Sequence, residues 1–260
     1  MTDDVAAEGT LAGRTVLITG GNGGIGLGMA AGCARAGASI VIWGRDADKN
    51  RRAVEELSAL GSTAQAFRCD VSDPDAVAST FAESVAAAGG RIDAVFANAG
   101  TTGDGTPFVD LSLQEWHRVM RTNLDGVFLT LQAGAPHMVD RGGGGALVAV
   151  SSTSALHGAA NNEAYGTSKT ALLGLVRGLA VALARHAVRV NALVPGWTLT
   201  DLAAPAYASE RFRDATVRRT PVRRWADPAE MGPAAVFLAD PTTSFHTGDS
   251  VVVDGGYTVF

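Results

Sequence analysis

Short apolar runs alternate with longer Ala-rich segments along this chain. Several runs lack the alternation of apolar and polar positions that a half-exposed strand shows, and they are rich in Val, Ile, Leu and Ala. Runs of this kind predict parallel strands that are buried on both faces. The predicted strands are Thr15–Thr19, Ser39–Trp43, Ala64–Cys69, Ala94–Ala97, Ala146–Ser151, Val188–Val194 and Ser250–Val253.

The segments between these runs have helical patterns. The predicted helices are Gly24–Ala36, Ala47–Leu60, Asp73–Ala88, Ser112–Gly134, Asn162–His186 and Pro228–Leu238. Alternation of strands and helices is typical of an α/β fold with a doubly wound parallel sheet, the Rossmann fold, in three α/β/α layers. Because no linker divides the chain, we expect residues 1–260 to form a single domain, with the polar segment 1–10 flexible.

Composition and charge narrow the class of protein. Hydrophobic residues make up 47% and charged residues 18% of the 260, which indicates a substantial core and no disordered chain. The net charge of -5 offers no basic excess, so nucleic acid is not an expected partner. The N-terminus lacks a signal-peptide pattern, and glycines and an arginine interrupt the apolar run Leu172–Leu183. We therefore expect a soluble, cytoplasmic protein with no membrane partner.

Cysteines and histidines suggest no metal centre. Cys33 and Cys69 lie in apolar surroundings and match no metal-ligand spacing, and the histidines are scattered. We expect no metal site and no disulfide, with both cysteines as ordinary packed thiols in a reducing compartment.

A glycine-rich segment lies between the first predicted strand and the first predicted helix. It reads Thr19-Gly20-Gly21-Asn22-Gly23-Gly24-Ile25-Gly26. Such glycines allow a tight turn and let the backbone approach a pyrophosphate, and the helix N-terminus offers free N–H groups to the phosphates. The segment therefore predicts a dinucleotide site.

The end of the second predicted strand bears on the choice of dinucleotide. A carboxylate at the ribose-reading position, here Gly44, would bind the ribose of NAD and repel the 2′-phosphate of NADP. Its absence, with Arg45 as the next residue, favours NADP(H). NAD(H) stays possible, because Asp46 is close enough to bind the ribose and Gly23 leaves the loop without a second basic residue.

Tyr165 and Lys169 are four residues apart on a predicted helix and share one face of it. A free tyrosine has a pKa of about 10, and a fixed neighbouring cation lowers it. Ser152, thirteen residues before the tyrosine, is placed to hydrogen-bond the oxygen of a carbonyl or alcohol. Together the three residues predict a proton-transfer site.

These motifs resemble those of the short-chain dehydrogenase/reductase family, from Leu11 to Tyr257. The matching positions are Thr19–Gly26, Asp70 with Val71, Asn98-Ala99-Gly100 (with Ala97 in place of an asparagine), Asn123, Ser152, Tyr165, Lys169, Pro195–Thr200 and Asp254–Gly256. The resemblance implies an NAD(P)-dependent oxidoreductase that interconverts a secondary alcohol and a ketone by hydride transfer.

The resemblance also implies a role for each catalytic residue. Tyr165 would exchange a proton with the substrate oxygen, while Lys169 would lower its pKa and bind the nicotinamide ribose. Ser152 would orient that oxygen, and Asn123 would hold a water in a relay to Lys169. The expected cofactor-binding residues are Gly20, Asn22, Gly23, Gly24, Ile25, Gly26, Arg45, Asp70, Val71, Asn98, Ala99, Gly100, Tyr165, Lys169, Pro195, Gly196, Thr198 and Thr200.

The substrate pocket is less defined by the sequence. Ser154 and His157 follow Ser152 at the carboxyl end of a strand, where ligands bind in an α/β sheet. The resemblance implies a substrate flap over residues 197–224, and we expect Trp197 and Tyr207 in it to contact substrate. A solvated histidine and a packed tryptophan are the alternatives. The candidate substrates are 3-oxoacyl thioesters, sugar acids or polyols, and secondary-metabolite ketones.

Two further expectations concern turnover and assembly. A cofactor-binding protein without turnover, with a sensing or assembly role, is the alternative function, and the complete catalytic set argues against it. The resemblance implies a homotetramer or homodimer with Ser112–Gly134 and Asn162–His186 at an interface.

Overall fold

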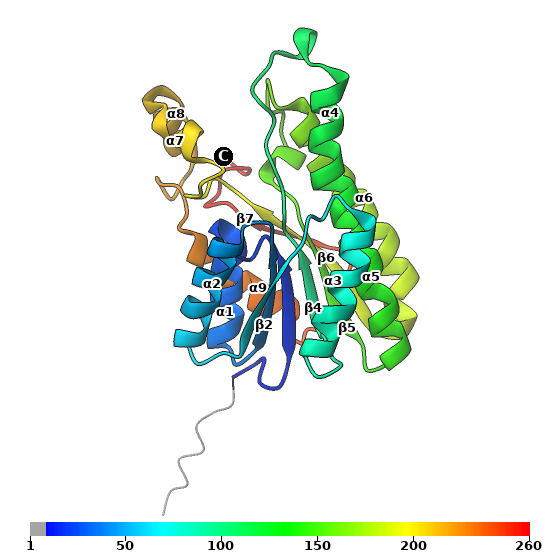
Figure 1. Ribbon diagram of the computed structural model, residues 1–260. Helices are drawn as coiled ribbons and strands as arrows, with labels where there is room; N and C mark the ends of the chain where they lie inside the picture. The colour runs from blue at the N-terminus through cyan, green and yellow to red at the C-terminus, as the bar shows by residue number, and fades with distance from the viewer. Residues whose placement is uncertain (1–8) are drawn as a thin grey trace, which may run out of the picture.

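A computed structural model describes residues 9–260 of the chain (Figure 1). Apart from its last two residues, the segment 1–10 that we expect to be flexible lies outside the described residues. Within residues 9–260 the strands form one seven-stranded parallel sheet in the order β3-β2-β1-β4-β5-β6-β7. The strands are β1 Thr15–Thr19, β2 Ser39–Gly44, β3 Ala64–Arg68, β4 Ala94–Ala97, β5 Gly145–Val150, β6 Val188–Pro195 and β7 Ser250–Val253. The predicted doubly wound sheet is confirmed.

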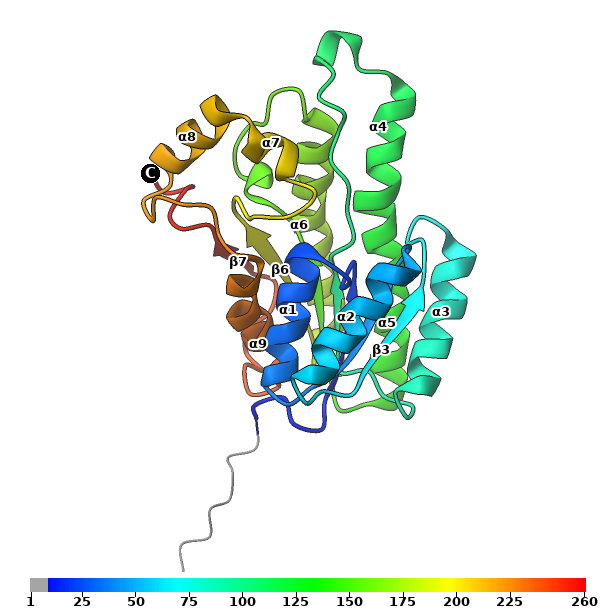
Figure 2. The ribbon, with the colours of Figure 1, turned by 60° about the vertical axis from the view of Figure 1, so that its left-hand side comes forward.

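Helices cover both faces of this sheet (Figures 1 and 2). They are α1 Gly24–Arg35, α2 Ala47–Ala59, α3 Pro74–Ala87, α4 Leu113–Met120, α5 Gly126–Arg141, α6 Glu163–Leu183, α7 Ala204–Ala208, α8 Glu210–Arg219 and α9 Gly232–Ala239. Helices α1, α2 and α9 pack on one face, and α3, α5 and α6 pack on the other. Short 3₁₀ turns lie at Phe108–Asp110, Thr153–Ala155, Ala184–His186 and Pro228–Met231, and a π-helical turn lies at Arg121–Asp125.

The two faces explain why the strand sequences do not alternate. Along β1, Val16 and Ile18 contribute to the core beneath α1 and α9, whereas Leu17 contributes to the core beneath α3, α5 and α6. All three side chains are fully buried. A parallel strand with helices on both sides buries every position, so each position is apolar.

The helix predicted over Ser112–Gly134 differs from the structure. It consists of α4, the π turn and α5, and it continues to Arg141. Pro136 removes one helical hydrogen bond but does not end α5, because Leu131 and Met138 on either side of it are buried against the sheet. Gly142 ends the helix with a φ of 70°, a conformation that favours glycine.

Helix α6 and the 3₁₀ turn after it, Glu163–His186, are together long and apolar enough to cross a membrane, judged by length and composition alone. This stretch is longer than the apolar run Leu172–Leu183 that stands out in the sequence. In the structure Leu172, Leu173 and Val176 are buried in the core beside the sheet. These contacts are those of a core helix.

The crossing of the chain from β3 to β4 positions the site. The first strands run outward from β1 to β3, and the chain then returns to place β4 on the other side of β1. At such a reversal of strand order the loops at the carboxyl ends of β1 and β4 diverge and leave a crevice, where open α/β sheets bind ligands. The segment with α7 and α8 lies above this end of the sheet (Figure 2).

Candidate active site

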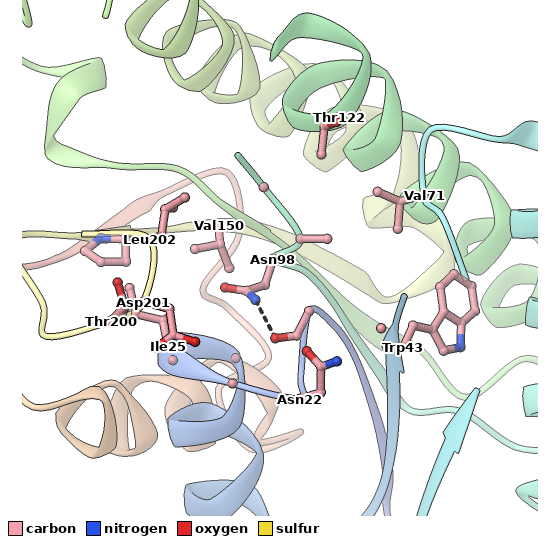
Figure 3. A pocket seen from close by; sticks show the side chains of 18 of the residues that line it. Asn22, Ile25, Trp43, Val71, Asn98, Thr122, Val150, Thr200, Asp201 and Leu202 are labelled. Carbon is pink, nitrogen blue, oxygen red and sulfur yellow. Dashed lines mark hydrogen bonds between the residues drawn. The ribbon is translucent and has the colours of Figure 1, made fainter. Parts of the chain in front are cut away.

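A cavity of about 410 Å³ lies at the carboxyl end of the strands, where the strand order reverses (Figure 3). It gathers segments that follow β1 to β6, together with the first turns of α6. The predicted site residues that line it are Gly20, Asn22, Gly23, Gly24, Ile25, Gly26, Arg45, Asp70, Val71, Asn98, Ala99, Gly100, Ser152, Tyr165, Lys169, Pro195, Gly196 and Thr200. Six further predicted residues do not line it: Asn123, Ser154, His157, Trp197, Thr198 and Tyr207.

Gly44, the predicted ribose-reading position, also lines the cavity. Eight further lining residues were not predicted: Trp43, Lys49, Cys69, Thr122, Val150, Ser151, Asp201 and Leu202. Position at a strand end is a signal that reveals several of them, such as Trp43, Cys69 and Val150, since the carboxyl ends of parallel strands share one edge. Lys49 and Asp201 carry no such signal, because 152 positions of chain separate them.

The glycine-rich turn is built by close backbone packing. A Cβ on Gly26 would collide with the carbonyl oxygen of Gly20 and would lie 2.6 Å from the side-chain nitrogen of Asn98. That nitrogen donates to the backbone oxygen of Thr19 at 2.9 Å and to that of Gly20 at 3.4 Å, and the second bond is drawn in Figure 3. Asn98 therefore ties the end of β4 to the end of β1 and holds the turn in place.

The same turn fits an anionic ligand. A Cβ on Gly23 would meet nothing within 4 Å, so the backbone there is open. Gly23 is the N-cap of α1 and provides no side-chain cap, and the first turn of α1 has no acidic residue. The N–H groups at the start of α1 are thus left to a ligand in the cavity, and the helix dipole favours a negative charge there.

A side chain at Gly44 would require neighbouring side chains to move. A Cβ there would overlap the side chains of Asn22 and Asn50. These two amides are joined by a hydrogen bond of 2.7 Å, and Asn50 also donates to the Gly44 carbonyl oxygen at 3.0 Å. A carboxylate at the ribose-reading position would therefore displace this pair of amides, a steric cost that the sequence alone does not reveal.

Arg45 and Asp70 face each other at the outer end of the cavity. Their charged atoms lie 3.8 Å apart, and the Arg45 side chain is 74% exposed. Asp70 accepts hydrogen bonds from the backbone and the hydroxyl of Ser72, at 3.0 and 2.7 Å, and these bonds with nearby Arg45 lower its pKa. Asp46 instead caps α2 and does not line the cavity. Arg45 thus remains reachable for a phosphate.

Lys169 is buried in the cavity wall beneath Tyr165. Its ammonium group donates to the Val150 carbonyl oxygen at 2.8 Å and lies 5.7 Å from the centre of the Tyr165 ring. Burial lowers the pKa of Lys169 to about 8. The ammonium group therefore loses its proton more readily than that of an exposed lysine.

The pKa of Tyr165 differs from the sequence expectation. We expect Lys169 to lower it, but burial raises it above its ordinary value. A hydrogen bond with Ser152 acts in the opposite direction and is the weaker effect. The physical reason is desolvation: the protein packed around the phenol disfavours the phenolate.

Ser152 lies between β5 and the 3₁₀ turn that follows. Its hydroxyl accepts a hydrogen bond of 3.1 Å from the backbone N–H of Ser154, which fixes the side chain at the cavity. The neighbouring Ser151 is buried, and its hydroxyl donates to the Lys169 carbonyl oxygen at 2.8 Å. Ser151 therefore fastens β5 to α6, and Ser152 is the serine placed beside Tyr165.

Asn123 lies in the π turn, fully buried, and does not reach the cavity. Its amide accepts from the Thr101 N–H and donates to the Thr101 carbonyl oxygen, both at 2.8 Å. It also donates to the Ser168 hydroxyl at 3.3 Å. The side chain joins the segment after β4 to α6, and its polar atoms are engaged there. Turns of the π type are frequent at functional sites.

The residues expected to contact substrate pack elsewhere. The Trp197 ring stacks on Trp225 at 4.9 Å, and Tyr207 meets Trp225 edge-on at 4.9 Å. The His157 ring lies 5.4 Å from that of Tyr257. These side chains, with Ser154, do not line the cavity, and the four substrate contacts stay a prediction. Aromatic packing turns the three rings toward other rings of the protein.

Thr198 was expected among the cofactor-binding residues, and the structure buries it instead. Its hydroxyl donates to the Gly196 carbonyl oxygen at 3.1 Å, and the residue bridges to Ala226. This bridge anchors the base of the segment that leads to α7.

The low pKa of Lys169 predicts a pH dependence of stability. The unfolded chain, with an ordinary lysine pKa of 10.5, binds more protons than the folded protein between pH 8 and 10.5. Below pH 8 the folded protein bears the whole free-energy cost of burying the charged ammonium. This cost falls as the pH rises, because the buried lysine loses its proton. We expect the free energy of unfolding of the wild type, relative to Lys169→Met, to rise through this window in urea denaturation. A difference that stays constant with pH would contradict the assignment.

Comparison with known proteins shows which family the chain belongs to. The model of the family described as "Enoyl-(Acyl carrier protein) reductase" matches residues 20–258. The solved structure of a short-chain type dehydrogenase/reductase from Mycobacterium marinum is 35% identical, with a TM-score of 0.90 over 95% of this chain and 96% of that one. The chain belongs to the short-chain dehydrogenase/reductase family.

Two members of this family carry more specific names. L-rhamnose 1-dehydrogenase (NAD(P)(+)) of Azotobacter vinelandii is 36% identical over 250 residues, which cover 95% of this chain and 97% of the relative. The gluconate 5-dehydrogenase of Burkholderia cenocepacia, solved in complex with NADP and tartrate, is 35% identical. Its TM-score is 0.90, over 96% of this chain and 97% of that one. The family assignment confirms the resemblance seen in the motifs and makes the chain an oxidoreductase.

Proposed function

We propose that this protein is an NAD(P)-dependent dehydrogenase that interconverts a secondary alcohol of a sugar or sugar acid with the corresponding ketone. The observation that carries the proposal is the convergence of Ser152, Tyr165 and Lys169 in the cavity of the glycine-rich turn. The names of the related rhamnose and gluconate dehydrogenases support the substrate class. They favour sugar acids and polyols over the acyl thioesters and secondary-metabolite ketones that the sequence also allowed.

The nicotinamide, when bound, accepts or donates the hydride. The residues of the chain hold it and move the proton. The uncapped start of α1 and the open backbone at Gly23 would hold the pyrophosphate. Arg45 would hold a 2′-phosphate, and Asp70 and Val71 would contact the adenine. Lys169 would hold the nicotinamide ribose.

Tyr165 would act as the general acid or base. In alcohol oxidation the phenolate oxygen takes the hydroxyl proton, and in ketone reduction the phenol returns it to the carbonyl oxygen. Ser152 would donate a hydrogen bond to that same oxygen and stabilise the charge that develops on it. The nearby ammonium of Lys169 would favour the phenolate and offset the desolvation that raises the Tyr165 pKa.

Asn123 would serve as a positioning residue. Because its side chain is engaged with Thr101 and Ser168, the contribution of Asn123 to catalysis would come from the shape of the π turn. A Cβ placed on Gly100 would lie 3.3 Å from the Asn123 oxygen and 3.6 Å from the Lys169 nitrogen, so both residues flank Gly100. The turn would thus help to fix the wall around the lysine.

Turnover with a carbonyl panel tests the proposed function. NADPH and NADH would each be mixed with 5-keto-D-gluconate, sorbose, a 3-oxoacyl thioester and a simple cyclic ketone, and the loss of nicotinamide absorbance followed. We expect the highest kcat/KM with a polyhydroxylated ketone. Turnover confined to the thioester would overturn the substrate class, and binding without any turnover would favour a sensing or assembly protein.

Arg45→Ala is expected to weaken NADPH binding about tenfold, because a charge-assisted contact to the 2′-phosphate is lost. NADH binding should change little, since NADH has no such phosphate. Fluorescence titration with both nucleotides measures the two effects. Arg52→Ala is the matched control, because Arg52 is an exposed arginine of α2 that does not line the cavity. An equal loss for NADH would show that Arg45 does not read the phosphate.

We also propose that the protein forms a homo-oligomer through α4, α5 and α6. Large apolar side chains are exposed on these helices, among them Leu113, Phe128 and Val181. Burying such side chains against a second copy removes apolar surface from water. A stable particle of 26.6 kDa in light scattering, the mass of one chain, would contradict this assembly.

A further inference from the structure

An ion pair crosses the mouth of the cavity. The Lys49 ammonium and a carboxylate oxygen of Asp201 lie 2.8 Å apart, and both residues line the cavity. Lys49 is in the first turn of α2, beside the expected adenosine end of the cofactor. Asp201 follows β6, beside the expected nicotinamide end. The pair thus connects two walls that are far apart in the sequence.

The segment Thr200–Leu202, here called the strap, lies over the glycine-rich turn. A Cβ on Gly24 would be 3.0 Å from the Thr200 methyl group, so the Thr200 side chain packs against the backbone of Gly24. Figure 3 places Thr200 and Asp201 beside Ile25, at the start of α1. A ligand held by the N–H groups at the start of α1 would therefore lie under the strap.

The strap is anchored at its base and exposed at its tip. Its base is fixed where the N–H of Leu199 donates to the Ala226 carbonyl oxygen at 2.9 Å. At the tip, Asp201 and Leu202 are exposed. Among residues 9–260, the Asp201 side chain hydrogen-bonds to Lys49 and to no other residue. The ion pair is therefore the polar contact that holds the tip to α2.

We propose that Lys49 and Asp201 form a clasp that holds the strap across the bound dinucleotide and slows its release. The inference rests on the proposed function, because it requires a dinucleotide in the cavity. The clasp would hold the strap in place and would not contact the 2′-phosphate, so it would slow the release of NADH and NADPH equally. It also keeps the Asp201 carboxylate paired beside the phosphates, where an unpaired carboxylate would be repelled.

A different role for Lys49 makes the opposite prediction. If Lys49 were simply a phosphate ligand, Asp201 would compete with the phosphate for it and would repel the cofactor. Asp201→Asn would then strengthen binding and slow release, with the larger effect on NADPH if Lys49 reads the 2′-phosphate. If the pair is a clasp, Asp201→Asn should speed release of both nucleotides. The direction of change in one variant separates the two roles.

Stopped-flow fluorescence gives the dissociation rates of NADPH and NADH from the wild type, Asp201→Asn, Lys49→Met and the double variant. An exposed ion pair of this kind predicts release about twofold to fivefold faster in Asp201→Asn for both nucleotides. The double variant should be no faster than Lys49→Met, because either change opens the clasp. Asp48→Asn and Arg51→Met are matched controls, since these two residues pair with each other on the outer side of α2.

The outcomes are distinct. Faster release of both nucleotides, with non-additive effects in the double variant, supports the clasp. Slower or unchanged release from Asp201→Asn, in a protein that binds cofactor, overturns the clasp and leaves the proposed function intact. A wild type that binds neither nucleotide overturns the proposed function itself, and the clasp with it.

Discussion

Tyr165→Phe is expected to lower kcat by about 10²- to 10⁴-fold, the range for loss of a positioned general acid or base. The phenol is the group beside both Ser152 and Lys169 that can exchange a proton with the substrate oxygen. The ring remains, so packing in the cavity wall is preserved. Steady-state kinetics with the substrate found in the carbonyl panel measures the effect. Cofactor titration should show an affinity within about twofold of the wild type, since the charged groups that would hold the cofactor stay in place.

Tyr207→Phe is the matched control for this experiment. It makes the same chemical change at a tyrosine that packs on Trp225 and does not line the cavity. We expect kcat to be nearly unchanged in this variant. If Tyr207→Phe were as damaging as Tyr165→Phe, or if Tyr165→Phe retained wild-type turnover, the general acid would have to be another group.

Gly26→Ala is expected to have the second large effect. The added methyl group would collide with the Gly20 carbonyl oxygen and approach the Asn98 side chain. The oxygen belongs to the tight turn itself, so it cannot move aside without moving the end of β1. Overpacking of this kind costs about 1–3 kcal/mol and sometimes more. Urea denaturation should show this loss, and cofactor titration should show weaker binding because the turn is displaced.

Gly23→Ala tests whether the effect comes from the collision rather than from any change in the loop. Gly23 has an extended backbone and open space around its Cβ position. We expect its free energy of unfolding to stay within about 0.5 kcal/mol of the wild type. Cofactor affinity should fall all the same, because the methyl group occupies space that faces the phosphates. Equal destabilisation by the two substitutions would contradict the steric argument.

The strands could be predicted from the sequence with little error. The bounds predicted for β1, β4 and β7 match the structure, and the other four differ at one end or both by a single residue. Burial on both faces makes each strand a continuous apolar run, and the flanking glycines and polar residues mark its ends. The end of the helix that contains Pro136 was harder to predict, because proline usually ends a helix. Here α5 continues past Pro136, since Leu131 and Met138 are packed in the core.

Within the site, too, features that depend on local sequence could be predicted, and features that depend on tertiary packing could not. The glycine-rich turn and the pair Tyr165 and Lys169 are local patterns, so their spacing along the chain is also their arrangement in space. The environment of Tyr165 is not local. Whether burial or the nearby lysine controls its pKa depends on the protein packed around the phenol. Trp197 and His157 are also near the site in sequence, yet their contacts with Trp225 and Tyr257 turn them away from the cavity.

The sequence by itself determined the fold class and predicted the dinucleotide site and the residues for proton transfer, because each depends on periodicity or short spacing. Only the tertiary structure decided that two amide side chains crowd the Cβ position of Gly44, that Asn123 is engaged away from the cavity, and that Lys49 meets Asp201. These facts depend on contacts between segments far apart in the chain. The folded sheet brings such segments to one edge, and no local pattern records which of their side chains will touch.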